Sequence, residues 1–439
     1  MKIVLLSGGS GRRLFPLSSD ARPKQFLKIL KDGRGGRQSM LQRVRGQIRA
    51  ALPDAEVLIA ANASQAGIIE SQLRGEVDVV LEPERRDTFP AIALACAYLR
   101  DAMSASPGET VVAMPVDPYA DIGFFQALSG VEEALACAKL VLMGIQPAAP
   151  ESKHGYIIPG GRLRGGALKV ESFVEKPDEA TARGLIGSGA LWNAGVFGFR
   201  LEYGLDLSGG ASYEKLLEEY GSLEKISFDY KVAEREPDIA VIPYNGMWSD
   251  LGTWNALAAQ MGGYVTGNGL LERATDTYII NELGAPIIAL GTRSLVIAAS
   301  PDGILVADLA QSPHLKEAVG TLELQRPMRK ERGCGEYTVL DRIECANGAE
   351  SLVRRLRLSA GRSMSFRAHE RRDAVWTVAS GVADFTLDGE TRRISAGGAI
   401  KIVRGQNHSI AAVTDVHIIE VQTGELLDET DAEKFEKGF

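Results

Sequence analysis

Through about residue 260 the chain alternates short apolar runs with stretches whose apolar residues recur at helical spacing. Strands are expected at Val57–Ala61, Val77–Leu81, Thr110–Pro115 and Leu140–Ile145. Helices are expected between them, for example over Met40–Ala50 and Pro90–Met103. This alternation predicts an α/β fold with a mostly parallel, doubly wound, Rossmann-like sheet that carries helices on both faces and binds ligands at the carboxyl ends of its strands.

A glycine-rich loop, Ser7–Gly11, directly follows the first predicted strand, Ile3–Leu6, and two cations, Arg13 and Lys24, come soon after. Glycine lets a backbone approach an anion closely and turn its N–H groups toward it, while the cations add charge that amides lack. The spacing is neither that of the P-loop nor that of a dinucleotide fold. A plain strand-to-helix turn has no packing reason to hold these glycines and charges together, so the sequence predicts a phosphate-binding loop.

Composition narrows the class of protein. With 45% hydrophobic and 24% charged residues, the 439-residue chain can bury a large core in two or three domains. Its net charge of -8 argues against a nucleic-acid partner. The longest fully apolar run, Ala91–Leu99, is too short to span a bilayer, and the first apolar run is too short for a signal peptide. We therefore expect a cytoplasmic protein with no membrane partner.

The four cysteines show no C-x-x-C pair. Cys96 and Cys137 lie in Ala-rich helical patterns and are expected in the core. A link between Cys334 and Cys345 is disfavoured by a reducing compartment.

Beyond Gly263 the pattern changes to short β-rich runs, followed by a helical turn near His314–Val319. The runs are Thr277–Ile280, Ile287–Leu290, Leu295–Ala299 and Ile304–Ala307. A charged stretch with a proline, Gln325–Gly333, indicates a linker. After it, strands at about ten-residue intervals predict a β-barrel or jelly roll. We expect three domains: residues 1–263, a small β-rich module at 264–324, and a barrel at 325–439.

Five further segments carry chemical groups after the glycine loop. They are Leu81–Leu94, Met114–Asp117, His154–Ile157, Phe173–Pro177 with Leu191–Phe197, and Trp248–Trp254. Together with the loop they closely resemble the bacterial mannose-1-phosphate guanylyltransferases, or GDP-mannose pyrophosphorylases, over residues 1 to about 325. The tail resembles the phosphomannose-isomerase-like cupin half of the two-domain members. Six motifs in order make this resemblance specific.

The resemblance implies a nucleotidyltransferase that makes GDP-mannose and pyrophosphate from GTP and mannose 1-phosphate. A sugar-phosphate oxygen attacks the α-phosphorus in line, so that catalysis consists of positioning and charge neutralisation. Arg13 and Lys24 would hold the β- and γ-phosphates, and Lys176 the sugar phosphate. Nucleotide binding is implied for Ser7, Gly8, Gly9, Gly11, Glu82, Asp87 and Thr88.

The same resemblance implies a sugar site and a metal site. Gly155, Glu175 and Asn193 would contact the hexose, and Asp117 and Asp250 would bind Mg²⁺, which typically takes one or two protein carboxylates. Guanine presents N–H donors, and Glu82 or Asp87 offers the acceptor that they need. Packing in the core is the favoured interpretation of Trp192, Trp248 and Trp254.

The chain departs from the family at Arg12, Phe15, Asp87 and Pro118, close to the nucleotide and the metal. These departures leave open a pyrophosphorylase for another hexose 1-phosphate or another base. A non-catalytic regulator that binds sugar nucleotides is disfavoured, because both aspartates and all three cations are kept. A homodimer is compatible with the β-rich module and the tail as association surfaces.

The cupin-like tail lacks most of a metal site. A metal cupin needs about four His and Glu ligands, and the corresponding positions here hold Arg367, His369, Ala374 and His408. Two imidazoles remain, and we expect no carboxylate. The sequence therefore predicts that isomerase activity is lost and disfavours a bifunctional enzyme.

Overall fold

The computed structural model describes residues 1–8, 11–322, 327–344, 349–425, 427 and 433–434. The chain divides into two compact units. The first consists of Met1–Ser10, Gln25–Ala66 and Gly75–Gly262, and the second of Gly11–Lys24, Gly67–Arg74 and Gly263–Phe439. In the described part of the chain, no helix is both long and apolar enough to cross a membrane.

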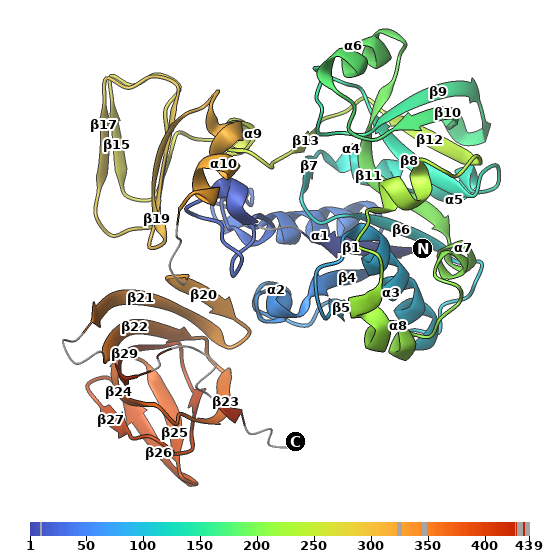
Figure 1. Cartoon of the computed structure of the whole chain (residues 1–439). Helices are drawn as coiled ribbons and strands as arrows, with labels where there is room; N and C mark the ends of the chain where they lie inside the picture. The colour runs from blue at the N-terminus through green and yellow to red at the C-terminus, as the bar shows by residue number, and fades with distance from the viewer. Residues whose placement is uncertain (9–10, 323–326, 345–348, 426, 428–432, 435–439) are drawn as a thin grey trace. The chain divides into compact units, whose positions relative to one another are not determined.

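The first unit is built on a nine-stranded sheet in the order β5-β4-β1-β6-β11-β8-β12-β10-β9 (Figure 1). Its strands are β1 Lys2–Ser7, β4 Glu56–Asn62, β5 Asp78–Glu82, β6 Thr110–Pro115, β8 Leu140–Ile145, β9 Tyr156–Arg162, β10 Leu168–Val174, β11 Leu191–Arg200 and β12 Ile239–Tyr244. The α/β class is confirmed, and the four runs expected to be strands are β4, β5, β6 and β8.

The sheet is mixed rather than mostly parallel. Strands β5, β4, β1 and β6 run parallel, as do β8 and β12. Strand β11 is antiparallel to β6 and β8, and β9 pairs antiparallel with β10. A short turn such as the one between β9 and β10 can only return the chain antiparallel, because a parallel crossover needs a dozen residues or more. The prediction holds for the half of the sheet that carries the glycine loop.

The first unit also contains helices. They are α1 Met40–Ala51, α3 Thr88–Asp101, α4 Ile122–Ala127, α5 Gly130–Ala134, α6 Glu179–Gly187, α7 Leu201–Leu207, α8 Tyr213–Glu219 and α9 Trp254–Gln260. Ser39 and Gln42 form a capping box that begins α1. Helix α3 is buried along most of its length, with Leu94 and Leu99 fully enclosed in the main core. Both predicted helices are therefore confirmed, with ends shifted by one or two residues.

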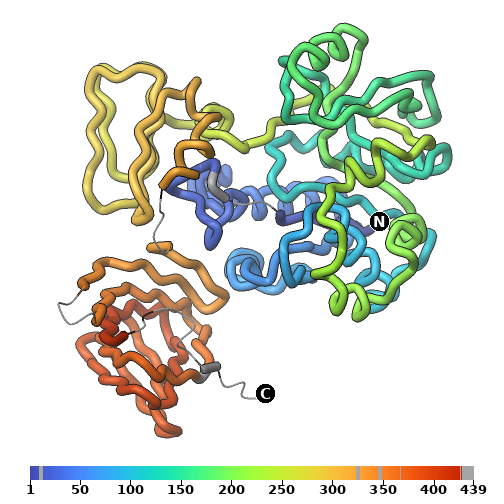
Figure 2. Tube along the Cα trace, in the orientation of Figure 1, coloured from blue at the N-terminus to red at the C-terminus, as the bar shows by residue number. Residues whose placement is uncertain are grey.

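The second unit contains a β-rich module in which short strands stack in parallel (Figure 2). Its elements are β14 Val265–Thr266, β15 Gly269–Glu272, β16 Tyr278–Asn281, β17 Ile287–Leu290, β18 Leu295–Ser300, β19 Gly303–Asp308 and α10 Leu315–Gly320. A small core of Ile279, Ala289 and Ile297 fills it. The four strands and the helical turn expected here are confirmed within a residue or two.

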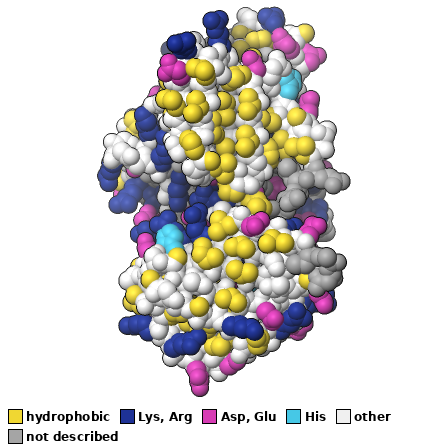
Figure 3. Space-filling model, turned by 90° about the vertical axis from the view of Figure 1, so that its left-hand side faces the viewer, with side chains coloured by type: hydrophobic (Ala, Val, Ile, Leu, Met, Phe, Trp, Pro, Cys, Tyr) yellow, Lys and Arg dark blue, Asp and Glu magenta, His cyan; other side chains and the backbone are white. Residues whose placement is uncertain are grey.

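Hydrophobic side chains lie on the surface of this module. Leu270, Ile288, Leu290, Ile304 and Val306 are each more than half exposed. Figure 3 shows hydrophobic side chains gathered on this face of the molecule. Contiguous exposed apolar surface of this kind is typical of interaction sites.

The rest of the second unit is a barrel of two sheets, ordered β20-β21-β22-β29-β24-β27 and β26-β25-β28-β23-β30. The strands are β20 Arg329–Arg332, β21 Gly335–Glu344, β22 Glu350–Leu358, β23 Ser363–Ala368, β24 Arg372–Ser380, β25 Val382–Leu387, β26 Glu390–Ser395, β27 Ala399–Ile402, β28 His408–Ala412, β29 Val416–Gly424 and β30 Glu433–Lys434. The predicted barrel is confirmed.

One element of the barrel corrects the sequence analysis. Residues 329–332 are not linker but the edge strand β20, which pairs antiparallel with β21. Charged residues are common on edge strands, because one side of such a strand faces solvent. Charge density alone therefore gave the wrong interpretation.

Of the two cysteines expected in the core, one is buried and the other is exposed. Cys96 is fully buried in the main core, as expected, but Cys137 is exposed in the turn after α5. The helix ends at Ala134, so the helical spacing that suggested burial does not reach Cys137. Cys334 is a free thiol, and Cys345 lies outside the described residues.

The segments of the second unit that come early in the chain are fastened by a charged network. Arg22 makes a two-pronged contact with Glu282, at 2.8 and 3.0 Å. Glu282 also contacts Arg329 at 3.3 Å, and Arg329 contacts Glu336 at 2.6 Å. The Ser300 hydroxyl donates to the Pro16 carbonyl at 2.7 Å. Residues 11–24 therefore belong to the same unit as the module and the barrel.

Candidate functional site

The glycine loop begins where β1 ends. Ser7 is buried; its hydroxyl donates to Gln65 Oε1 at 2.9 Å and accepts from Gln25 Nε2 at 3.1 Å. Gly8 is exposed, and a Cβ built on it would meet nothing within 4 Å. The Ser7 side chain is thus used to anchor the start of the loop, while the Gly8 backbone faces open space.

The remaining predicted residues of the loop belong to the second unit or lie outside the description. Gly9 is not among the described residues. Gly11 begins a 3-10 turn, Gly11–Leu14, in which Arg13 is exposed, and Lys24 begins a second turn, Lys24–Phe26. Gly11, Arg13 and Lys24 are grouped with the second unit.

Two predicted metal ligands are brought together by a two-stranded sheet within the first unit. Strand β7, Pro118–Ala120, pairs antiparallel with β13, Trp248–Asp250, so that Asp250 lies across from Pro118 and hence next to Asp117. Both aspartates are partly exposed. Strand pairing thus brings the backbone of Asp250 to the residue that follows Asp117, near the carboxyl end of β6, where α/β folds bind ligands.

His154 feels the charge of Asp250 and lies against two tryptophans. Its ring centroid is 4.8 Å from that of Trp192 and 5.7 Å from that of Trp248. Burial lowers the pKa of His154, and the charge of Asp250 opposes this shift. Trp254 is fully buried and Trp192 nearly so, as expected for the core, but Trp248 is partly exposed and flanks His154. The prediction of a purely structural role in the core is wrong for Trp248.

The three residues predicted to bind the sugar come together. The Asn193 N–H donates to the Gly155 carbonyl at 2.8 Å. A Cβ on Gly155 would stand 2.5 Å from Glu175 Oε2 and 2.8 Å from the Phe173 ring, so only glycine fits there. Glu175 is 5% exposed and forms an ion pair with Lys176, which is half exposed. Three separate segments therefore converge on one small surface.

Lys176 is held in an unusual backbone conformation, with φ at +46°. Burial acts to lower the pKa of its ammonium, but the hydrogen bond to Glu175 and the charge of Asp229 outweigh burial and raise it. The ammonium lies 5.6 Å from the centroid of the Tyr230 ring. Lys176 is therefore a fixed cation at the edge of this surface.

Asp229 completes the cluster and was not predicted. It accepts a hydrogen bond from Asn193 Nδ2 at 2.7 Å and begins a π-helical turn, Asp229–Ala233, a type of turn frequent at functional sites. Burial, and next the charge of Glu175, raise its pKa to about 7, while Lys176 opposes the shift. The only sequence signal was an acid between the aromatic residues Phe228 and Tyr230, a pattern too common to single out.

The residues predicted to hold the base have different surroundings. Glu82 is buried and accepts a hydrogen bond from the Tyr220 hydroxyl at 2.6 Å, and burial raises its pKa. Thr88 Oγ1 accepts from the Phe228 N–H at 2.8 Å. Asp87 is exposed and caps α3 by accepting from the Thr88 N–H at 2.8 Å. Of the two carboxylates predicted to accept from the base, Asp87 is therefore the accessible one.

The barrel interior holds both predicted imidazoles. The rings of His369 and His408 lie 5.1 Å apart, and Arg372 Nη2 is 3.0 Å from His369 Nδ1. Ala374 is buried, and Arg367 lies on β23. Among the described residues no group of three or more His, Cys, Asp or Glu side chains is placed to hold a metal ion.

A carboxylate from outside the cupin motif, that of Glu420, is buried in the barrel. It accepts from Arg354 Nε at 2.8 Å, Trp376 Nε1 at 3.0 Å and Gln422 Nε2 at 2.8 Å. Although burial alone raises it, Arg354 and these hydrogen bonds lower the pKa of Glu420 to about 2. The motif positions are Arg367, His369, Ala374 and His408, so the motif could not find a residue on β29.

Comparisons with known proteins agree with this arrangement. A model of the nucleotidyl transferase family matches residues 2–265. The chain therefore belongs to the nucleotidyl transferase family, as the motifs indicated. A second model, for the mannose-6-phosphate isomerase C-terminal family, matches residues 321–437.

Particular relatives narrow the resemblance. The Salmonella typhimurium protein named mannose-1-phosphate guanylyltransferase RfbM is 32% identical, over 99% of this chain and 96% of its own. The Xanthomonas campestris xanthan biosynthesis protein XanB is also 32% identical, over 99% and 97%. A crystal structure from Thermus thermophilus, described as a mannose-1-phosphate geranyltransferase, is 31% identical, with a TM-score of 0.62 over 73% of this chain and 98% of that one.

The raised pKa of Asp229 predicts a pH-dependent gain in stability for Asp229→Asn. Between about pH 4 and pH 7 the folded protein retains a proton that the unfolded chain has lost, so this group lowers the free energy of unfolding as the pH rises. In Asp229→Asn the side-chain oxygen can still accept the hydrogen bond from Asn193. The amide does not titrate, so the variant does not lose stability as the pH rises. We expect no gain near pH 4 and a gain of about 1–2 kcal/mol above pH 7.

Denaturant unfolding at pH 4.5, 6 and 8 measures this difference. Asp206→Asn, an exposed site on α7, is the matched control. A gain for Asp229→Asn that is the same at every pH would contradict the titration of this carboxyl.

Proposed function

We propose that the protein is a mannose-1-phosphate guanylyltransferase, which forms GDP-mannose and pyrophosphate from GTP and mannose 1-phosphate. The observation that carries the proposal is the convergence of Gly155, Glu175, Lys176 and Asn193 in the unit that also holds the paired aspartates. The names and full-length coverage of the relatives support the same substrates.

In the proposed reaction, an oxygen of the sugar phosphate attacks the α-phosphorus of GTP, the bond to the β-phosphate oxygen breaks, and pyrophosphate leaves. Lys176 contacts the sugar phosphate, and Glu175 and Asn193 accept or donate hydrogen bonds to the hexose hydroxyls. Asp229 fixes the Asn193 amide through its hydrogen bond. The close approach at Gly155 lets the backbone lie against the sugar ring.

The nucleotide side rests on the glycine loop. The backbone amides of Gly8, Gly9 and Gly11 would point to the triphosphate. Arg13 and Lys24 would neutralise the β- and γ-phosphates and thereby stabilise the departing pyrophosphate. Asp87, rather than the buried Glu82, is the proposed acceptor for the guanine N–H donors, because its carboxylate is exposed.

The paired aspartates fit a divalent cation. Asp117 and Asp250, on two segments that pair through Pro118, offer carboxylate oxygens, a donor type that suits Mg²⁺ with phosphates and water in its other positions. When bound, Mg²⁺ neutralises phosphate charge. We propose these two residues as its protein ligands.

We further propose that the protein acts in the cytoplasm, where GTP is available, and that it binds neither nucleic acid nor membrane. The exposed apolar surface of the β-rich module is the proposed contact of a homodimer. Sedimentation measures whether the wild type is a dimer and whether the Ile288→Lys variant, which places a charge on this surface, is a monomer.

Substitution of either metal-binding aspartate tests the assignment. Asp117→Asn or Asp250→Asn removes a carboxylate charge without changing side-chain volume, so turnover should fall by about 100-fold or more while the fold persists. The assay is pyrophosphate release at saturating Mg²⁺, and Asp54→Asn, an exposed site, serves as control. Near-wild-type rates in both variants would refute the metal assignment.

A panel of nucleoside triphosphates and hexose 1-phosphates tests the substrates. Pyrophosphate release should be fastest with GTP and mannose 1-phosphate, because adenine lacks the N1–H and N2–H₂ donors that the Asp87 carboxylate would accept from guanine. Asp87→Ala should raise the KM for GTP more than that for ATP. Equal use of GTP and ATP by the wild type would overturn the choice of base, and no turnover with any pair would favour the non-catalytic regulator.

The barrel is proposed to have no isomerase activity. A guanidinium at Arg367 has no lone pair to offer a metal, and Ala374 offers no ligand. Mannose 6-phosphate should therefore not be converted to fructose 6-phosphate in the presence of Zn²⁺, Co²⁺ or Mn²⁺. Conversion that disappears in His369→Ala would establish a bifunctional enzyme instead.

A further inference from the structure

The chain between the two predicted phosphate-binding cations rests on a turn of the β-rich module, the turn that joins β18 to β19. The Ser300 hydroxyl of this turn donates to the Pro16 carbonyl at 2.7 Å. Gly303 lies so close to Phe15 that a Cβ on the glycine would stand 2.8 Å from the ring. The backbone that follows the 3-10 turn of the glycine loop is therefore seated on the module.

The barrel begins at the same turn. Asp302 of the turn accepts a hydrogen bond from the Met328 N–H at 2.6 Å, just before β20. Arg329, the first residue of β20, contacts Glu282 at 3.3 Å, and Glu282 pairs with Arg22. Two contacts, one made by the backbone and one by a charge, thus connect the start of the barrel to the supports of the chain between the cations.

The other end of β20 lies against helix α2, Ala66–Leu73. The Ser71 hydroxyl donates to the Glu331 carboxylate. Arg362, in the turn before β23, pairs with Glu70 of the helix at 3.0 Å. Two consecutive side chains of the helix therefore contact the barrel.

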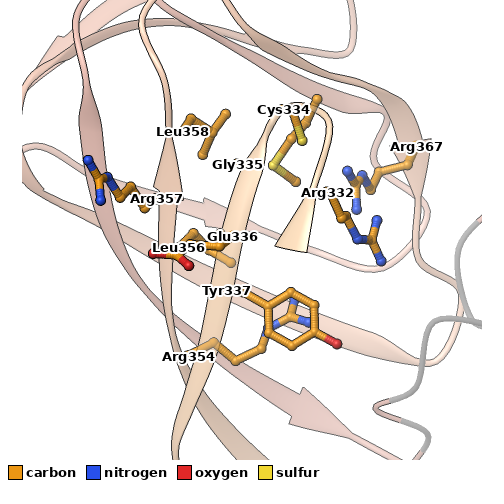
Figure 4. Close-up of a pocket in the computed structure, with 11 residues that line it drawn as sticks. Arg332, Cys334, Gly335, Glu336, Tyr337, Arg354, Leu356, Arg357, Leu358 and Arg367 are labelled. Atoms are coloured by element: carbon orange, nitrogen blue, oxygen red, sulfur yellow. The ribbon is translucent and has the colours of Figure 1, made fainter. Parts of the chain in front are cut away.

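The backbones of the helix and the barrel also approach each other closely. A Cβ on Gly67 would stand 3.2 Å from both the Arg332 Cα and the Gly333 nitrogen, so a larger residue would require one backbone to move. Figure 4 shows the turn after β20, with Cys334 and Gly335, which also lines a pocket of the barrel. The helix is thus held by backbone packing as well as by side chains.

Helix α2 comes directly after a residue that anchors the glycine loop. Gln65 immediately precedes the helix, and its Oε1 accepts from the Ser7 hydroxyl at 2.9 Å. One strand of the barrel, β20, is therefore connected to two supports of the loop, the helix that follows Gln65 and the module that holds the chain after Arg13.

We propose that the barrel positions the phosphate-binding cations of the transferase, and that Arg329 is a positioning residue that acts through Glu282 and Arg22. Arg13 and Lys24 can neutralise the β- and γ-phosphates only from the correct place, and a displacement of about 1 Å in such a site costs a large part of the effect. This role rests on the proposed function, and it gives a part in nucleotidyl transfer to a barrel that is proposed to have no isomerase activity.

Arg329→Gln in the full chain tests the proposal, because it removes the charge that reaches Glu282 and leaves the direct pair with Arg22 in place. Dissociation constants for GTP and for GMP are measured by titration calorimetry with Mg²⁺ and without sugar phosphate. Arg393→Gln is the matched control, because it removes an arginine that contacts Asp384 at 2.8 Å elsewhere on the barrel.

The dissociation constant of GTP should rise about tenfold in Arg329→Gln and stay unchanged in Arg393→Gln. That of GMP should not change in either variant, because GMP lacks the β- and γ-phosphates. In turnover assays kcat/KM for GTP should fall by about the same factor, with an unchanged KM for mannose 1-phosphate. A mere loss of folded protein lowers kcat and moves neither KM.

Ser71→Ala, which removes one hydroxyl from the contact of α2 with β20, is the second variant if circular dichroism shows that Arg329→Gln does not fold. Its dissociation constant for GTP should rise about threefold. An unchanged value for GTP in the folded variant, or an equal rise for GMP, would overturn the proposal.

The same experiment separates this proposal from the proposed function. A wild type that binds GTP but shows no turnover would refute the proposed function alone, because the calorimetric comparison with Arg329→Gln does not require turnover. A wild type that binds no GTP at about 10 mM would overturn both.

Discussion

The partly buried carboxylate of Glu282 connects three parts of the second unit. Arg22 comes from the segment that follows the glycine loop, Glu282 from the β-rich module, and Arg329 from the first strand of the barrel. The side chains of Arg22 and Glu282 are only 10% and 18% exposed, so removal of one partner would leave a poorly solvated charge. The backbone that carries Arg13 and Lys24 is thus fixed by an ion pair with a residue 260 positions away.

The spacing of apolar residues predicted most helices and strands correctly. It did so because one face of each element is buried in a core, and burial requires apolar residues at the period of that element. Strands β6, β8 and β17 have the predicted ends, since each is an apolar run bounded by turn residues. Strand β20 was missed because an edge strand needs no apolar alternation. Sequence could not predict the antiparallel half of the sheet, because strand direction depends on pairing between segments far apart in the chain.

In the candidate site, too, local motifs predicted some residues, and residues that depend on long-range contacts were missed. The motifs located Gly155, Glu175 and Asn193, and the structure brings them together. Asp229 and Glu420 were missed because neither lies in a motif, and their roles come from partners brought close by folding. Glu82 lies in a motif, but the sequence did not show that its carboxylate is buried and accepts a hydrogen bond from Tyr220 in the folded protein.

The backbone conformation of Lys176 sets the stability of the fold against the position of a cation. Its φ of +46° lies in the left-handed region, where a residue with a Cβ is less stable than glycine by roughly 1 kcal/mol. Glycine would relieve that strain but would remove the cation, whereas the natural residue keeps the ammonium on a backbone that resists it. Redesign of this loop for stability alone would therefore favour a change that improves the fold and removes the charge proposed to contact the sugar phosphate.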